Sequence, residues 1–499
     1  MSVYDGMQVR WLKAVCFGAI TLVQGGCALL VFDELSDSRS GSGGGSTKNG
    51  GEIVSGAQFG QTNDQIVQGV VIDGPHRVVM AGMTLGNSIQ DVGCSATTKG
   101  GLDAFITWAD PNDLKVECPT SRLLGGPLND VPRAIAVNPA SGGVGFTGFS
   151  TGDFDCGKGG LPNQGGRDIV VAAFVKDSCS WQQSFGGEGD QEAETIAFDS
   201  TGAAYIGGRF KGTLTFDQPP PAPATEFDGF IAKLSFDTGA PLWSVYAGGP
   251  GNQEVHALAI HAPDTIIVGG RFSQTLDLKC PESIPVLQAG HDALFIASLD
   301  GPTKTCKKFI TIAEGPQEAE DSPISLAVAE DGDIFVAGGF RSRTLFPDQP
   351  PCNQVNTTQA EDVFVAKLNI NGECQWSRRF GEVDSPLAQP QRAHAIAVDE
   401  ASNVYVTGQF HGRVAFGETH VFQSLGDADA FVLKLDGAGE HVWSNVIAST
   451  GTESGNALVL DAAGGFVFVT GSFRDSPLNL AGKKLTPSGL DVFLAKFVR

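Results

Sequence analysis

Residues 395–408 read AIAVDEASNVYVTG, and this phrase is the strongest fold signal in the chain. A segment that alternates small and bulky apolar residues is followed by a turn and then by a β-branched run that ends in glycine. The alternating segment recurs as residues 69–72, 134–137, 195–198, 257–260, 325–328, 395–398 and 457–460. The glycines that end the following run lie 60 to 70 residues apart, at Gly82, Gly148, Gly208, Gly270, Gly338, Gly408 and Gly471. This periodicity predicts one repeat architecture rather than several unrelated domains.

Each repeat contains signals for two more strands. The third strand opens with aspartate in every copy, at Asp103, Asp168, Asp228, Asp292, Asp362, Asp429 and Asp491. The fourth is marked in four copies by tryptophan, at Trp181, Trp243, Trp376 and Trp443. Four short antiparallel strands form one twisted sheet, the unit of a propeller blade. A single sheet of this size cannot bury both of its faces, so the copies must stack.

Two features predict that the stack closes into a ring. The innermost strand alternates small and bulky residues, which suits wedge-shaped blades that converge on a central axis. The last repeat ends after its third strand, while residues 53–60 before the first repeat read as a fourth strand. We therefore predict an all-β, seven-bladed β-propeller in which residues 53–60 pair with residues 491–498 and leave no open sheet edge.

The repeats resemble a known family. Residues 395–399, 404–408 and 429–435 are similar to the β-propeller repeats of secreted and surface proteins of bacteria. The resemblance covers residues 52–499, implies export and a surface location, and brings no shared catalytic residues. The cysteine-bearing repeats and the glycine-rich segment also resemble exported lipoproteins of soil-dwelling predatory bacteria, the myxobacteria.

The N-terminus has the layout of an export signal. Arg10 and Lys13 precede an uncharged, mostly apolar run from residue 14 to residue 32. Gly25 and Gly26 stand directly before Cys27, which resembles the bacterial lipoprotein signal, in which the cysteine is lipidated. Gln24 departs from that pattern, which has an aliphatic residue there. A run of this length also suffices to span a bilayer uncleaved, so lipidation at Cys27, an uncleaved anchor and plain secretion all remain open.

The chain therefore divides into three parts. We assign residues 1–32 to the signal and anchor, residues 33–51 to a linker, and residues 52–499 to the propeller. Residues 36–51 read SDSRSGSGGGSTKNGG, a composition that buries no apolar area and is typical of a flexible tether. All three readings of the N-terminus place the propeller outside the cytoplasm, in the cell envelope, on the outer membrane or cell surface, or free in the medium.

Eight cysteines follow the leader, as pairs separated by 24, 23, 26 and 22 residues. Four repeats have both members of a pair and three repeats have neither, which is what a disulfide requires. We predict the bonds Cys94–Cys118, Cys156–Cys179, Cys280–Cys306 and Cys352–Cys374, in keeping with an oxidising compartment. A thiolate metal site is disfavoured because the sequence contains no CxxC spacing.

The charge and the absent motifs exclude several functions. A net charge of −23 argues against nucleic acid as a partner. The sequence has no GxSxG, HExxH, P-loop or EF-hand motif, and we expect no cofactor and no metal. The seven strand-three aspartates lie one per repeat, so we expect them to accept hydrogen bonds from local turn amides rather than to gather around a cation.

The candidate site is the position just before each inner strand, where we expect the chain to reach the channel mouth. It varies around the ring although the neighbouring strand is uniform, and variation on a uniform scaffold often marks function. The seven residues are Gln68, Arg133, Glu194, His256, Ile324, His394 and Asn456. The alternative is a solvated polar rim with no ligand.

We expect a monomeric, non-enzymatic surface module that binds a protein or glycan. The alternatives are an extracellular hydrolase or lyase that acts at the channel mouth, with His256, His394 and Glu194 as its acid and base groups, and a purely structural envelope lipoprotein.

Overall fold

The computed structural model describes residues 50–499 apart from short gaps, which are residues 61–63, 75, 86–97, 119–120, 219–221, 262, 281–286, 290–291, 315–323, 342–344, 347–348, 351, 353–359, 382–388 and 418. Residues 48–499 form one compact unit. The predicted signal segment, Cys27 and almost all of the linker lie outside the described residues. Within the described part of the chain, no helix is long and apolar enough to cross a membrane.

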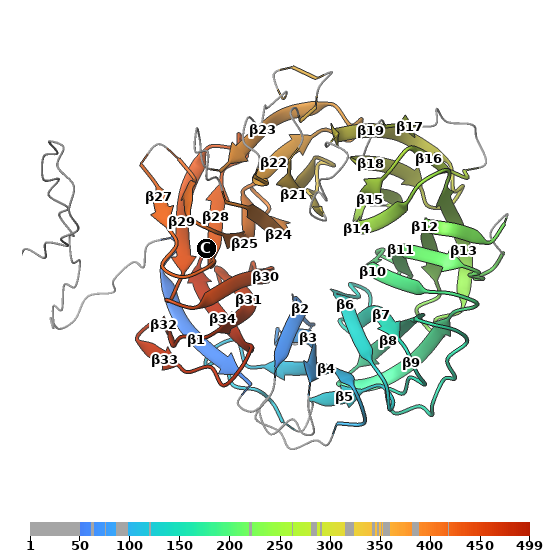
Figure 1. Ribbon diagram of the computed structural model, residues 1–499, viewed down its shortest axis with the longest axis horizontal. Helices are drawn as coiled ribbons and strands as arrows, with labels where there is room; N and C mark the ends of the chain where they lie inside the picture. Colours follow the sequence, from blue (N-terminus) through green and yellow to red (C-terminus); the bar gives the residue numbers. More distant parts are fainter. Residues whose placement is uncertain are drawn as a thin grey trace, which may run out of the picture. The chain divides into compact units, whose positions relative to one another are not determined.

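The described residues form seven antiparallel blades, mostly of four strands, arranged in a ring (Figure 1). The innermost strands are β2 (Gln65–Ile72), β6 (Asp130–Val137), β10 (Gln191–Phe198), β14 (Gln253–His261), β20 (Ser325–Val328), β24 (Gln391–Val398) and β30 (Thr452–Asp461). The second strands are β3 (Val78–Leu85), β7 (Val144–Ser150), β11 (Ala204–Gly212), β15 (Thr265–Phe272), β21 (Ile334–Phe340), β25 (Val404–Phe410) and β31 (Phe466–Arg474). We number the blades 1 to 7 in this order.

The outer half of each blade completes the sheet. The third strands are β4 (Leu102–Ala109), β8 (Asp168–Val175), β12 (Ala224–Leu234), β18 (Ala293–Asp300), β22 (Asp362–Leu368), β28 (Asp429–Leu435) and β34 (Asp491–Val498). The outermost strands are β5 (Arg122–Leu124), β9 (Ser178–Phe185), β13 (Pro241–Gly248), β19 (Cys306–Glu314), β23 (Cys374–Phe380), β29 (His441–Ile447) and β1 (Ile53–Phe59). Three small hairpins accompany them, β16 (Thr275–Leu278) with β17 (Leu287–Gln288), β26 (Arg413–Ala415) with β27 (Val421–Gln423), and β32 (Leu478–Leu480) with β33 (Lys483–Leu485).

The ring closes as predicted. Strand β1 pairs antiparallel with β34, from Ile53 opposite Phe497 to Phe59 opposite Val492. The contact extends into the end of the predicted linker, because Gly51 donates its N–H to the carbonyl of Val498 at 2.9 Å. The folded unit therefore begins at about residue 50, slightly earlier than the predicted boundary. Blade 7 is built from both ends of the folded unit.

The hydrophobic core lies between the blades. The described residues form seven buried clusters, one at each boundary between neighbouring blades, including the boundary between blades 7 and 1. Small residues on the inner strands allow this close approach. A Cβ placed on Gly69 of β2, for example, would lie 2.7 Å from Cγ2 of Ile135 on β6.

Glycines at the ends of outer strands have a specific steric cause. A Cβ on Gly186 would lie 2.1 Å from Oδ1 of Asp168, and a Cβ on Gly381 would lie 2.0 Å from Oδ1 of Asp362. The carboxyl of the aspartate that opens the third strand occupies the space that a side chain at the end of the fourth strand would need. This explains why glycine follows phenylalanine at these ends of the fourth strand.

Tryptophans of the fourth strand pack under the neighbouring blade. A Cβ on Gly439 of blade 6 would lie 2.8 Å from the ring of Trp376 in blade 5. Gly51 takes the corresponding place over Trp443 of blade 6, again at 2.8 Å. The residues before β1 therefore replace the missing turn of blade 7 as well as its missing strand.

The described residues contain three of the four predicted disulfides, Cys156–Cys179, Cys280–Cys306 and Cys352–Cys374. Each joins the start of a blade's outermost strand to the connection between its second and third strands. Cys94 lies outside the described residues, so the bond Cys94–Cys118 stays a prediction. In blade 6, His441 stands at the start of the outermost strand, where blades with a disulfide have the second cysteine of the pair. Its ring stacks on that of His420, with 4.0 Å between the ring centroids.

Candidate functional site

The seven candidate residues do not all stand where the sequence placed them. We predicted that each candidate residue directly precedes its inner strand. In six blades the strand instead begins three or four residues before the candidate residue, which therefore lies within the strand. In these six the antiparallel register shifts across the candidate residue, as between Val67 and Gly69 around Gln68. The candidate residue is therefore the extra residue of a β-bulge, a feature that re-aims a side chain. In blade 5, Ile324 directly precedes β20, as predicted.

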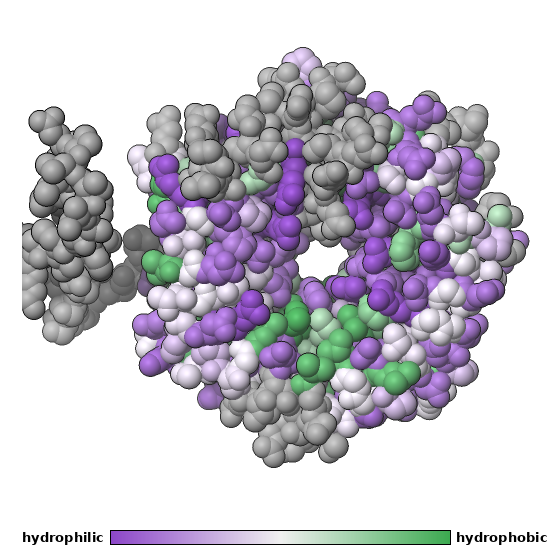
Figure 2. Space-filling model, viewed as in Figure 1, coloured by the Kyte–Doolittle hydropathy of each residue, from purple (hydrophilic) through white to green (hydrophobic). Residues whose placement is uncertain are grey.

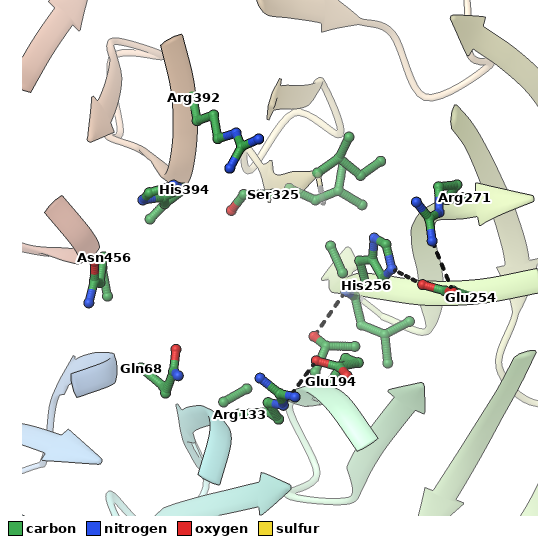
Figure 3. Close-up of a pocket in the computed structure, with 18 of the residues that line it drawn as sticks. Gln68, Arg133, Glu194, Glu254, His256, Arg271, Ser325, Arg392, His394 and Asn456 are labelled. Atoms are coloured by element: carbon green, nitrogen blue, oxygen red, sulfur yellow. Dashed lines mark hydrogen bonds and ion pairs between the residues drawn. The ribbon is translucent and has the colours of Figure 1, made fainter. Parts of the chain in front are cut away.

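All seven candidate residues line one cavity on the propeller axis (Figure 3). The cavity has a volume of about 740 Å³, which is within the range of small-molecule sites. The seven side chains thus lie at the channel, as the sequence analysis expected. That the cavity binds a ligand stays a prediction. Ile324 is the exception in character, because it is apolar and only 4% exposed.

A buried carboxylate on β10 organises the charges on one side of the cavity. Glu192 has a side chain with no exposed surface and forms ion pairs with Arg133 and Arg209 at 3.4 Å each, and with Arg167. Burial opposes ionisation, but the three guanidiniums outweigh it and hold the pKa of Glu192 below its usual value. Glu192 is therefore an anion at neutral pH.

A second carboxylate continues this network into blade 4. Glu254 accepts hydrogen bonds from Arg209 and Arg271 at 3.1 Å and from Nε2 of His256 at 2.9 Å. Burial again opposes ionisation of Glu254. The hydrogen bond from His256 and the charges of Arg271 and Arg209 outweigh burial, so the pKa of Glu254 is far below its usual value. The dashed contacts in Figure 3 show His256 and Arg271 converging on this carboxylate.

Glu194 differs from these two carboxylates. Its Oε2 lies 3.5 Å from Nε of Arg133, beyond hydrogen-bonding distance. Burial dominates and raises the pKa of Glu194, although Arg133 and His256 oppose the rise. Glu194 therefore gains a proton more readily than an ordinary glutamate.

The opposite side of the cavity is formed by blades 5 to 7. Arg392 pairs with Glu361, whose side chain is fully buried, at 2.6 Å. Nδ1 of His394 donates to the carbonyl of Gly455 at 2.9 Å. Burial, with a smaller effect of Arg392, lowers the pKa of His394, so the ring is neutral near pH 7 and its Nε2 is an acceptor.

Neutral polar side chains complete the ring. Gln68, Ser325 and Asn456 are half-buried and line the cavity from blades 1, 5 and 7. Asn456 also donates to the carbonyl of Val67 at 3.0 Å, which ties blade 7 to blade 1. Figure 3 shows these side chains around the open centre between the two charged sides.

The rim is not uniformly polar. Figure 2 shows hydrophobic residues gathered beside the central opening over β2, β3 and β6, whereas the rest of the rim is mainly hydrophilic. Leu85, at the end of β3, and Leu128, just before β6, are 51% and 53% exposed. The sequence analysis did not single out these residues.

The second layer of the cavity also escaped the sequence analysis. Glu192, Glu254 and Arg392 stand two residues before the bulge, and Arg209 and Arg271 lie opposite Glu192 and Glu254 on the second strands. A signal was present, because the second strands of blades 3 and 4 both contain the letters GGRF. An arginine in two of seven copies is a local departure from the repeat, similar to the variation at the bulge.

The strand-three aspartates largely behave as expected. Asp103 and Asp429 accept hydrogen bonds from turn amides, of Lys99 at 3.1 Å and Leu425 at 2.8 Å. Asp362 differs, since it pairs with Arg379. Within the described residues, no group of three or more His, Cys, Asp or Glu side chains is placed to hold a metal ion.

Comparison with known proteins finds distant structural similarity and no match in sequence. No protein-family model and no curated protein matches the sequence. Solved structures that resemble the chain are β-propeller proteins. They include a polysaccharide lyase that acts on ulvan (10% identity, TM-score 0.45, 87% of this chain and 98% of that one). Another is the propeller domain of the trilobed protease from Pyrococcus furiosus (10% identity, TM-score 0.40, 85% and 98%). A third is virginiamycin B lyase from Staphylococcus aureus (9% identity, TM-score 0.42, 89% and 99%). At these identities no activity transfers to the present chain.

Proposed function

We propose that the protein is an exported, surface-anchored β-propeller that acts as a non-enzymatic binding module for a protein or glycan at its axial cavity. The observation that supports this best is the ring of seven candidate residues, six of which stand at β-bulges. Each blade supplies one side chain to the same cavity, and six of the seven are polar and differ between neighbouring blades. A purely structural role needs neither a cavity nor this variation.

The test is a glycan array and a pull-down with the full chain, in parallel with a Gln68→Leu/Asn456→Leu variant. These two changes remove neutral polar groups from the cavity and leave the charged network in place. We expect a ligand above background and at least a tenfold loss of its affinity in the variant. If no glycan or protein binds, or if binding is the same in the variant, the proposal fails.

Export is supported by the disulfides, because such bonds persist in oxidising compartments. We propose that Cys27 carries the lipid. Fatty-acid labelling of the cells is expected to mark the full chain and not a Cys27→Ser variant. An unlabelled protein that retains its N-terminus would instead indicate an uncleaved anchor, and release into the medium would indicate plain secretion.

One observation favours a second candidate, an extracellular hydrolase or lyase. Glu194 has a raised pKa and lies near Arg133 and His256 in the same cavity, and a carboxyl with a raised pKa suits general acid catalysis. Alanine at Glu194, His256 or His394 is then expected to abolish turnover of an extracellular polymer. Turnover that survives all three changes would exclude catalysis at this site.

A further inference from the structure

The axial cavity carries a charge opposite to that of the protein. The whole chain has a net charge of −23. The cavity, in contrast, is lined by four arginines and only two glutamates, which are Arg133, Arg209, Arg271, Arg392, Glu194 and Glu254. A cationic cavity within an acidic protein concentrates anions and repels cations.

The carboxylates near the cavity do not neutralise the arginines one for one. Five guanidiniums pair with four carboxylates, which are Glu192, Glu194, Glu254 and Glu361. Arg209 contacts both Glu192 and Glu254, whereas Arg392 pairs with Glu361. Each guanidinium has five N–H donors, so the arginines together offer more donors than these carboxylates can accept. Burial also raises the pKa of Glu194, so this carboxyl is a weaker acid than an ordinary glutamate.

Two of the guanidiniums are accessible from the cavity. The side chains of Arg133 and Arg392 are 30% and 39% exposed. They lie on opposite sides of the open centre, in blades 2 and 6 (Figure 3). Guanidinium groups form strong, paired hydrogen bonds with planar or tetrahedral oxyanions.

The rest of the cavity indicates what carries the anion. A volume of about 740 Å³ is far larger than a bare inorganic ion requires. Gln68, Ser325 and Asn456 provide neutral donors and acceptors, and Nε2 of neutral His394 is a further acceptor. Such groups suit a ligand with many hydroxyls.

We propose that the axial cavity binds an acidic saccharide and that Arg133 and Arg392 hold its carboxylate or sulfate groups. This inference rests on the proposed function and names the ligand chemistry of the same cavity. The carboxylate and the sulfate forms share the recognition by guanidinium, and separate probes distinguish them.

The test is calorimetric titration of the full chain at pH 7 and low salt with four probes. These are a trigalacturonate, its carboxyl-reduced neutral counterpart, a sulfated trisaccharide and a hexaglutamate peptide. We expect the trigalacturonate or the sulfated trisaccharide to bind at least tenfold more tightly than the neutral trisaccharide and the peptide. Binding is expected to weaken as salt is added, because screening reduces the attraction.

Two variants with opposite expected effects make the test specific. Arg133→Gln is expected to lower the affinity for the acidic saccharide about tenfold to a hundredfold, because a charge-assisted hydrogen bond is lost. Glu194→Gln removes a carboxyl and is expected to leave the affinity unchanged or to raise it. Arg413→Gln, at an exposed residue of β26 that does not line the cavity, is the matched control and is expected to change nothing.

The inference is overturned if neither acidic saccharide binds below about 10 mM, a limit that corresponds to roughly 2.7 kcal/mol of binding free energy. It is also overturned if the neutral trisaccharide or the peptide binds as tightly as the acidic saccharides, or if Glu194→Gln weakens binding as Arg133→Gln does. A neutral glycan whose binding is lost in the Gln68→Leu/Asn456→Leu variant would overturn this inference and leave the proposed function standing. The absence of every glycan and protein ligand would overturn both.

Discussion

A buried glutamate between blades 6 and 7 makes the stability of the protein depend on pH. We expect one substitution at this residue to remove that dependence. Glu453 is fully buried on β30, accepts hydrogen bonds from N and Oγ of Ser449, and lies beside Asp429 of blade 6. Burial, with the neighbouring Asp429, raises the pKa of Glu453 to about 7. The equivalent position in four other blades is a buried glutamine, at Gln65, Gln191, Gln253 and Gln391. A neutral amide avoids the cost of burying a charge.

The sign of the effect follows from linkage. The pKa of Glu453 in the folded protein, about 7, lies above the ordinary glutamate value of 4.5, so the folded state binds the proton more tightly. The protonated carboxyl stabilises the fold fully below pH 4.5, and this stabilisation is lost as the pH rises towards 7. A pKa difference of about 2.5 is worth about 3 kcal/mol. Because part of the rise in the pKa of Glu453 comes from the neighbouring Asp429, which the substitution leaves in place, we take ~2 kcal/mol as the amount that one substitution recovers.

We therefore expect Glu453→Gln to stabilise the protein by ~2 kcal/mol at pH 8 and to leave it unchanged at pH 4.5. The measurement is the urea midpoint of both proteins across this pH range. Gln391→Glu is the reciprocal control, since it places a carboxyl at the equivalent buried position of blade 6, where Gln391 donates to the carbonyl of His411, and it should destabilise more at the higher pH. If the difference between Glu453→Gln and the parent does not change with pH, or if the variant is less stable at pH 8, the reasoning is refuted.

Three further predictions concern the ring and its crosslinks. Gly186→Ala should cost about 2 kcal/mol or more in a denaturation measurement, because its Cβ would lie 2.1 Å from a buried carboxyl oxygen, whereas Gly160→Ala, with no atom within 4 Å, should be close to neutral. Deletion of residues 50–60 should leave the edge of β34 open and shift the protein to aggregates in size-exclusion chromatography; a monomeric, equally stable product would contradict closure by β1. A His420→Cys/His441→Cys double variant should form a disulfide where the two rings now stack, visible as a mobility change under reduction, and raise stability by up to about 3 kcal/mol; two free thiols in the folded variant would show that the geometry differs from that of the other blades.

The repeat made much of the fold predictable. Seven copies of one phrase average out local ambiguity, so the strand order, the alternation of the inner strand and three of the four predicted cysteine pairs were recoverable from the chain. The closing strand was also predictable, because the last repeat ends after its third strand and residues 53–60 before the first repeat read as a fourth strand. These signals are local, and each is repeated.

The bulge and the second layer of the cavity were not predictable in the same way. A bulge at Gln68 or His256 depends on how two strands pair, and a single strand's letters do not show where the register shifts. The ion pairs of Glu192 and Glu254 join residues of different blades, and their pKa values depend on burial that only stacking produces.

The sequence by itself determined that this chain stacks seven sheets, because a repeated unit that cannot bury its own faces has to stack, and the alternation of the inner strand with the extra strand at residues 53–60 indicated that the stack closes. Only the tertiary structure decided which residues share the axial cavity and which of their ionisable groups are charged there. The physical reason is that electrostatic energy depends on distance and burial across blades, and these arise only when residues far apart in the chain meet around one axis.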